Sequence, residues 1–92
     1  LLERRGQDNH KSRLQEIIQA RYKSPPRYRV TAAEGPDHAR IFRVSVAFNG
    51  HVLGRGEGTN KKSAEQEAAR AALATLEARA DLLDELSSPP EE

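Results

Sequence analysis

The feature that most constrains the fold is a strand followed at once by a tight-turn dipeptide. Phe42, Val44, Val46 and Phe48 alternate strictly with Arg43, Ser45 and Ala47, which is the two-residue period of a half-buried strand. Asn49-Gly50 comes next, and this pair favours a type I′ turn because both of its positions need positive φ. The residues from His51 to Gly56 are therefore expected to return as an antiparallel partner strand.

A helix and a further strand are predicted before this hairpin. A helix capped by Asp8 should run to about Tyr22, because Leu14, Ile17, Ile18 and Tyr22 recur at helical spacing. Ser24-Pro25-Pro26 ends it, since proline cannot continue a helix and restricts the residue before it. The strand that follows should turn Tyr28, Val30 and Ala32 inward, and residues 34–38 should form a turn.

The last predicted helix begins after Asn60 or Thr59, either of which is a good N-cap. Its inward face consists mainly of small residues, Ala64, Ala68, Ala71, Ala72 and Leu76, which should let it approach the sheet closely. It should run on, or restart, through Leu82, Leu83 and Leu86. The predicted class is α+β in the order α-β-β-β-α, with two helices packed on one face of a three-stranded antiparallel sheet.

Two adjacent lysines at the start of the last helix point to an anionic ligand. Lys61 and Lys62 follow the expected cap Asn60, where the helix dipole already supplies about half a positive charge. A phosphate is the natural ligand of such a cationic focus. The alternative is an ordinary solvated pair of lysines. A nucleotide P-loop is less well supported, because no Gly directly precedes a Lys-Ser/Thr pair, and GRGEG (54–58) does not have dinucleotide-motif spacing.

A polar stripe on the first helix is the second candidate binding feature. Ser12, Gln15 and Glu16, together with Gln19, share a face away from the apolar residues. Hydroxyl, amide and carboxylate groups can donate and accept hydrogen bonds, which suits a hydroxyl-rich surface. A solvated helix face would give the same pattern.

Charge is divided unevenly along the chain. From Asp8 to Leu76 there are twelve Lys and Arg against seven Asp and Glu, a net charge of +5. From Glu77 onward there is one base against six acids, a net charge of −5. A basic body favours a polyanionic partner. We therefore expect residues 1–7 to be a linker or the end of a preceding domain, residues 8–77 to be the binding domain, and residues 78–92 to be an acidic extension, partly helical and then disordered from Ser87.

Some function classes are not supported by composition. The chain has no Cys and three scattered His, at positions 10, 38 and 51, so no metal-ligand spacing is present. No apolar run reaches the length of a membrane span. The absence of cysteine fits a reducing compartment, and we expect a cytoplasmic location.

Five segments in order carry a resemblance to a known family. They are KSRLQE (11–16), EGPDHA (34–39), the F-x-V-x-V pattern of Phe42–Val46, LGRGEG (53–58) and NKKSAEQEAARAAL (60–73). Together they resemble a double-stranded RNA-binding domain, more narrowly the C-terminal domain of bacterial ribonuclease III, over about Asp8 to Leu76.

The resemblance implies three contacts with duplex RNA. Ser12, Gln15 and Glu16 would reach one minor groove, and Pro36, Asp37 and His38 would reach the next. Asn60, Lys61 and Lys62 would lie over the phosphates between them. Tyr22, Tyr28, Phe42 and Phe48 lie on apolar faces and are expected in the core, which argues against base stacking. Glu65 departs from eukaryotic members, many of which have a third Lys there.

The expected function is sequence-tolerant binding of double-stranded RNA, without chemistry or a cofactor in this chain. The resemblance implies that a parent would be an Mg²⁺-dependent, homodimeric endoribonuclease, whose catalytic signature is absent here. Two alternatives remain open: a protein–protein module of the same fold, and a stand-alone adaptor. Loss of the lysine pair or of the loop His would mark the protein–protein module, and both features are present.

Overall fold

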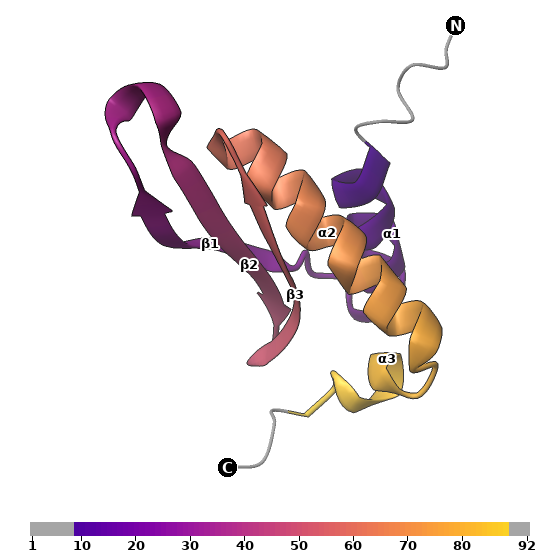
Figure 1. Ribbon diagram of the computed structural model, residues 1–92. Helices are drawn as coiled ribbons and strands as arrows, with labels where there is room; N and C mark the ends of the chain where they lie inside the picture. The colour runs from indigo at the N-terminus through magenta and orange to yellow at the C-terminus, as the bar shows by residue number, and fades with distance from the viewer. Residues whose placement is uncertain (1–8, 89–92) are drawn as a thin grey trace, which may run out of the picture.

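The computed structural model describes residues 9–88, and the N-terminal segment 1–7, the expected cap Asp8 and residues 89–92 lie outside this range. The elements are α1 (Asn9–Tyr22), β1 (Arg27–Glu34), the 3₁₀ turn η2 (Asp37–Ala39), β2 (Ile41–Phe48), β3 (His51–Gly58), α2 (Lys61–Ala78) and α3 (Leu82–Glu85). The strands form one antiparallel sheet in the order β1-β2-β3. Both long helices lie on the same face of that sheet (Figure 1). The predicted α-β-β-β-α fold is confirmed.

The hairpin forms as its turn residues require. Asn49 has φ of +51° and Gly50 has φ of +88°, the left-handed conformations that a type I′ turn needs. Phe48 pairs with His51 directly across the turn. The partner strand extends two residues beyond the predicted Gly56, to Gly58.

The predicted inward set of β1 is half-buried at Tyr28 and Ala32, but the pairing of this strand with β2 is irregular. The register shifts between Val30 and Ala32, so that Ala32 lies opposite Arg43 and Ala33 lies opposite Phe42. Ala32 nevertheless stays half-buried, whereas its neighbour Ala33 is exposed. Val30 remains opposite the buried Val44 but is 41% exposed at the sheet edge.

Glycines on β3 allow α2 to pack with its backbone against the sheet. A Cβ added at Gly56 would lie 2.3 Å from the amide nitrogen of Ala68, and one at Gly54 would lie 2.5 Å from that of Ala72. The side chains of Ala64, Ala68, Ala69 and Ala72 are fully buried at this contact. The close approach predicted from the alanine face therefore also requires the alternate glycines Gly54 and Gly56 on the strand. This contact holds α2 against the sheet.

The acidic C-terminal segment folds back onto the end of the core. After α2 ends, the chain restarts as the short α3, with Leu82 and Leu86 in the hydrophobic core alongside Leu14 and Ile18 of α1. The Tyr22 hydroxyl donates to the Leu83 carbonyl, and the Asn49 side-chain amide donates to the Leu86 carbonyl at 2.9 Å.

The two serines assigned by sequence to a disordered tail are also placed in the structure. The Ser87 hydroxyl donates to the Asp84 carbonyl at 3.1 Å, and the Ser88 carbonyl lies 2.7 Å from Nε2 of His51. Within residues 9–88, no helix is both long enough and apolar enough to cross a membrane.

Candidate nucleic-acid interface

The start of α2 presents two exposed lysine side chains. Asn60 is the N-cap, and its side-chain oxygen accepts from the backbone N–H of Ser63 at 2.8 Å. Lys61 and Lys62 are exposed in the first turn, which contains no acidic residue. Within residues 9–88, neither ammonium group takes part in an ion pair. The helix dipole and both lysines are therefore available to an anion.

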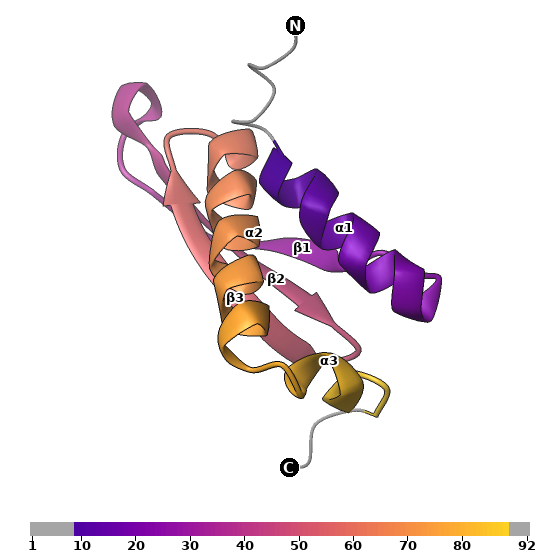
Figure 2. The same cartoon turned by 90° about the vertical axis from the view of Figure 1, so that its right-hand side faces the viewer.

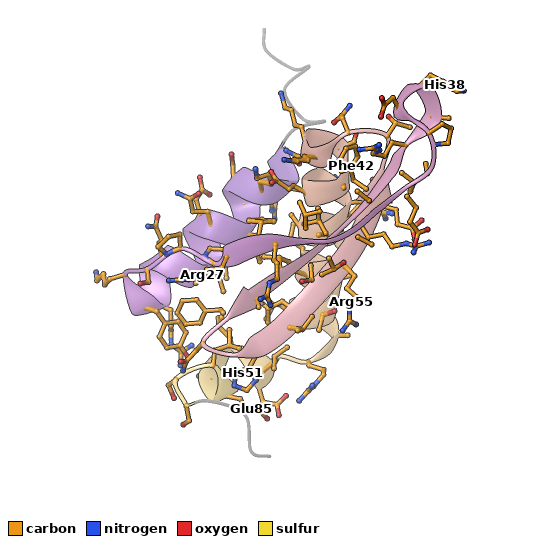
Figure 3. All side chains as sticks on the ribbon, turned by 90° about the vertical axis from the view of Figure 1, so that its left-hand side faces the viewer. Arg27, His38, Phe42, His51, Arg55 and Glu85 are labelled. Atoms are coloured by element: carbon orange, nitrogen blue, oxygen red, sulfur yellow. The ribbon has the colours of Figure 1, made fainter. Side chains whose placement is uncertain are left out.

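The connection between β1 and β2 is a projecting loop that is stabilised by its own hydrogen bonds. Gly35 has φ of +100°, and a Cβ there would lie 2.7 Å from the Ala39 carbonyl oxygen, so only glycine fits without strain. Pro36 then leads into η2, with the Ala39 N–H donating to the Pro36 carbonyl at 2.9 Å. His38 is exposed at the tip of this loop (Figure 3).

Arg40 is a functional candidate that the sequence reasoning missed. Its Nη2 donates to the Asp37 carboxylate at 2.7 Å, and its Nε donates to the Gly35 carbonyl at 3.4 Å. Arg40 therefore holds the loop that presents Pro36 and His38. The sequence signal for this contact was the spacing of Asp37 and Arg40, which are three residues apart and of opposite charge.

The polar stripe of α1 faces solvent as predicted. Ser12, Gln15 and Glu16 are exposed, whereas Leu14 and Ile18 on the other side of the helix are fully buried. The Gln15 side-chain amide donates to that of Gln19 at 3.3 Å, which lines the two amides up along the helix. The stripe thus has donors and acceptors that no core contact uses.

These three features lie toward one end of the molecule. In both ribbon views the N-terminal part of α1, the β1–β2 loop and the start of α2 lie at the same end, and α3 lies at the opposite end (Figures 1 and 2). Among the acids of that far end, Asp84 pairs with Arg21 and Glu85 pairs with Arg79. The acidic segment therefore lies away from Lys61 and Lys62.

The predicted core aromatics do not contribute to this surface. Tyr22, Tyr28, Phe42 and Phe48 are partly buried and packed against the core. Tyr22 and Phe48 are in ring contact, with centroids 5.1 Å apart. The site thus consists of hydrogen-bonding groups and cations, a composition suited to sugar hydroxyls and phosphates more than to stacked bases.

Comparison with known proteins identifies the family. The sequence profile described as "Double-stranded RNA binding motif" matches residues 10–76. The chain belongs to the double-stranded RNA binding motif family. Double-stranded RNA is accordingly its ligand, and the matched range contains all nine predicted contact residues.

Similar curated proteins are ribonucleases. Ribonuclease 3 of Symbiobacterium thermophilum is 52% identical over 65 residues, which are 71% of this chain and 28% of that protein. Ribonuclease 3 of Treponema denticola is 43% identical over 76 residues, 83% of this chain and 31% of that protein. Ribonuclease 3 of Desulfotalea psychrophila is 43% identical over 81 residues, which are 84% of this chain and 34% of that protein. This chain thus spans about a third or less of its relatives' length.

Proposed function

We propose that the chain recognises double-stranded RNA by shape, through two minor grooves and the phosphates between them. Ser12, Gln15 and Glu16 would bind 2′-hydroxyls and base edges in one minor groove. Pro36, Asp37 and His38 would enter the next minor groove, and Asn60, Lys61 and Lys62 would hold the intervening phosphates. The observation that carries this proposal is the pair of lysines at the start of α2, which form no ion pair within residues 9–88 and lie at the same end as the loop and the stripe.

Groove geometry explains why RNA is favoured over DNA. The major groove of A-form RNA is deep and narrow, whereas its minor groove is shallow and carries 2′-hydroxyls. Domains of this family span about 16 bp and read shape more than sequence. B-form DNA lacks the 2′-hydroxyls and places its grooves at a different spacing, so a rigid three-part surface cannot contact it fully.

We propose further that the chain is the substrate-binding domain of a ribonuclease III-type endoribonuclease. The relatives named Ribonuclease 3 support this parentage. Residues 9–88 contain no group of three or more His, Cys, Asp or Glu that could hold a metal. In such a parent the catalytic domain would hold Mg²⁺ and make the homodimer, and the enzyme would act in the cytoplasm.

A salt titration of RNA binding tests the role of the lysines. Replacing both, as Lys61→Ala/Lys62→Ala, should weaken binding to every duplex sequence. It should also lower the slope of log K against log[salt] by about 2, because two fewer counterions are released. The control is Lys23→Asn/Arg27→Ala, which removes two exposed cations near the other end of α1 and should leave the slope near wild type. An unchanged slope in the Lys61/Lys62 variant would refute the phosphate role.

A further inference from the structure

A polar cluster joins the two helices that contact RNA. The Lys11 ammonium group in α1 donates to the Glu65 carboxylate in α2, and the two side chains are 35% and 25% exposed. These residues are 54 positions apart in the sequence. The partial burial of this pair sets it apart from the more exposed Glu67–Arg70 pair, whose members lie two and five residues after Glu65 in α2.

Two neighbours extend the cluster to a third element. The Lys11 ammonium lies 5.0 Å from the centre of the Tyr28 ring in β1, within cation–π range. The backbone N–H of Lys11, which has no partner within its own helix turn, donates to the Gln66 side chain at 3.4 Å. Burial, and secondarily the Glu65 charge, raise the pKa of Tyr28 to about 12. Lys11 is therefore held by contacts from both α2 and β1.

The rest of the α1–α2 contact gives little directional restraint. Leu14 and Ile18 pack into a core whose fully buried residues on α2 are alanines such as Ala68 and Ala72, with Leu73 and Leu76 of α2 partly buried beside them. Apolar burial is non-directional, and small side chains provide few ridges to fix the rotation of a neighbouring helix. A charge-assisted hydrogen bond between the helices has a defined direction and length.

The position of this cluster couples two of the RNA-contacting parts. Lys11 directly precedes Ser12 of the minor-groove stripe, and Glu65 follows Lys62 by three residues, which is about one helical turn. We propose that Lys11 and Glu65 are positioning residues that set the spacing between the α1 stripe and the α2 lysines, and thereby select A-form RNA over B-form DNA. This inference rests on the proposed function.

Charge alone makes a different prediction from positioning. Glu65 lies about a turn from the phosphate-binding lysines, so its removal favours every polyanion, and removal of Lys11 disfavours every polyanion. Both effects act on RNA and DNA duplexes alike. The ratio of the two affinities therefore reports geometry separately from net charge.

The experiment measures affinity for RNA and DNA duplexes of equal length and sequence. Glu65→Gln and Lys11→Met change the net charge in opposite senses, yet each should lower the RNA-to-DNA affinity ratio about fivefold, as expected for coupled neighbours. The double variant should fall no further than either single variant. Lys11→Arg preserves the charge-assisted bond and should keep the wild-type ratio.

Matched controls come from the exposed pair on the same helix. Glu67→Gln and Arg70→Gln make the same changes of charge away from the cluster and should leave the ratio unchanged. Thermal unfolding of each variant shows whether it is folded. If Lys11→Met does not fold, the comparison of Glu65→Gln with Lys11→Arg still tests the proposal. Unchanged ratios, or ratios that fall equally in the controls, would overturn the positioning role. A wild-type protein without preference for RNA would overturn the proposed function as well.

Discussion

Replacing Gly56 by alanine should displace α2 from the sheet. The added Cβ would lie 2.3 Å from the Ala68 amide nitrogen and 2.6 Å from the Glu67 carbonyl carbon, whereas ordinary contacts begin at 3.4 Å. The helix would have to retreat by about 1 Å, the difference between 2.3 Å and the 3.4 Å of an ordinary contact. Overpacking of this kind costs about 1–3 kcal/mol, and we expect the upper end because the clash is with backbone.

Urea unfolding followed by circular dichroism measures this loss. In a domain of this size, about 3 kcal/mol corresponds to a fall in the melting temperature of roughly 12–24 °C. Adding Ala68→Gly should not rescue Gly56→Ala, because the Cβ meets the backbone of residue 68 and not its side chain. The control is Val52→Ala on the same strand, where the side chain is 50% exposed. A loss below about 1 kcal/mol for Gly56→Ala would refute the close-packing argument.

Three further predictions concern stability. Leu86→Ala should lower the free energy of unfolding by about 2–5 kcal/mol, because the side chain is fully buried; a loss under 1 kcal/mol in urea would show that α3 does not support the core. Asn60→Ala should cost about 1 kcal/mol for the lost cap, and thermal unfolding would contradict this if the melting temperature were unchanged. The folded pKa of Tyr28, about 12 against an ordinary 10.0, means that the unfolded chain loses this proton first. The contribution of Tyr28 to the free energy of unfolding is therefore fully present below pH 10 and is lost as the pH rises toward 12. Tyr28→Phe should remove this component of the alkaline loss, and an identical pH profile would contradict the assignment.

The hairpin and the α2 start were predictable because their signals are local. Asn49 and Gly50 themselves adopt the positive φ angles of the turn, and Asn60 caps α2 by accepting from the N–H of Ser63, three residues further on. The β1 bulge was not predictable, since the alternation of Tyr28, Val30 and Ala32 reads as regular until pairing with β2 is known. The packing of Leu86 likewise depends on α1 and the hairpin, which are distant in sequence.

All nine predicted contact residues are on the surface, and the structure adds the residues that support them. Sequence spacing placed Ser12, Gln15 and Glu16 on one exposed face, because helix periodicity fixes which residues share a side. It could not show that Glu65 pairs with Lys11. That contact joins residues far apart in the chain, so only the packing of α1 against α2 reveals it.

The most direct test of the account is a titration with three ligands of equal length: duplex RNA, duplex DNA and single-stranded RNA. A fixed salt concentration is needed, because phosphate contacts make every affinity salt-dependent. The account predicts that duplex RNA binds most tightly, since only it offers 2′-hydroxyl-lined minor grooves at the spacing of the three contacts. Equal or tighter binding of duplex DNA or of the single strand would contradict recognition by the shape of double-stranded RNA.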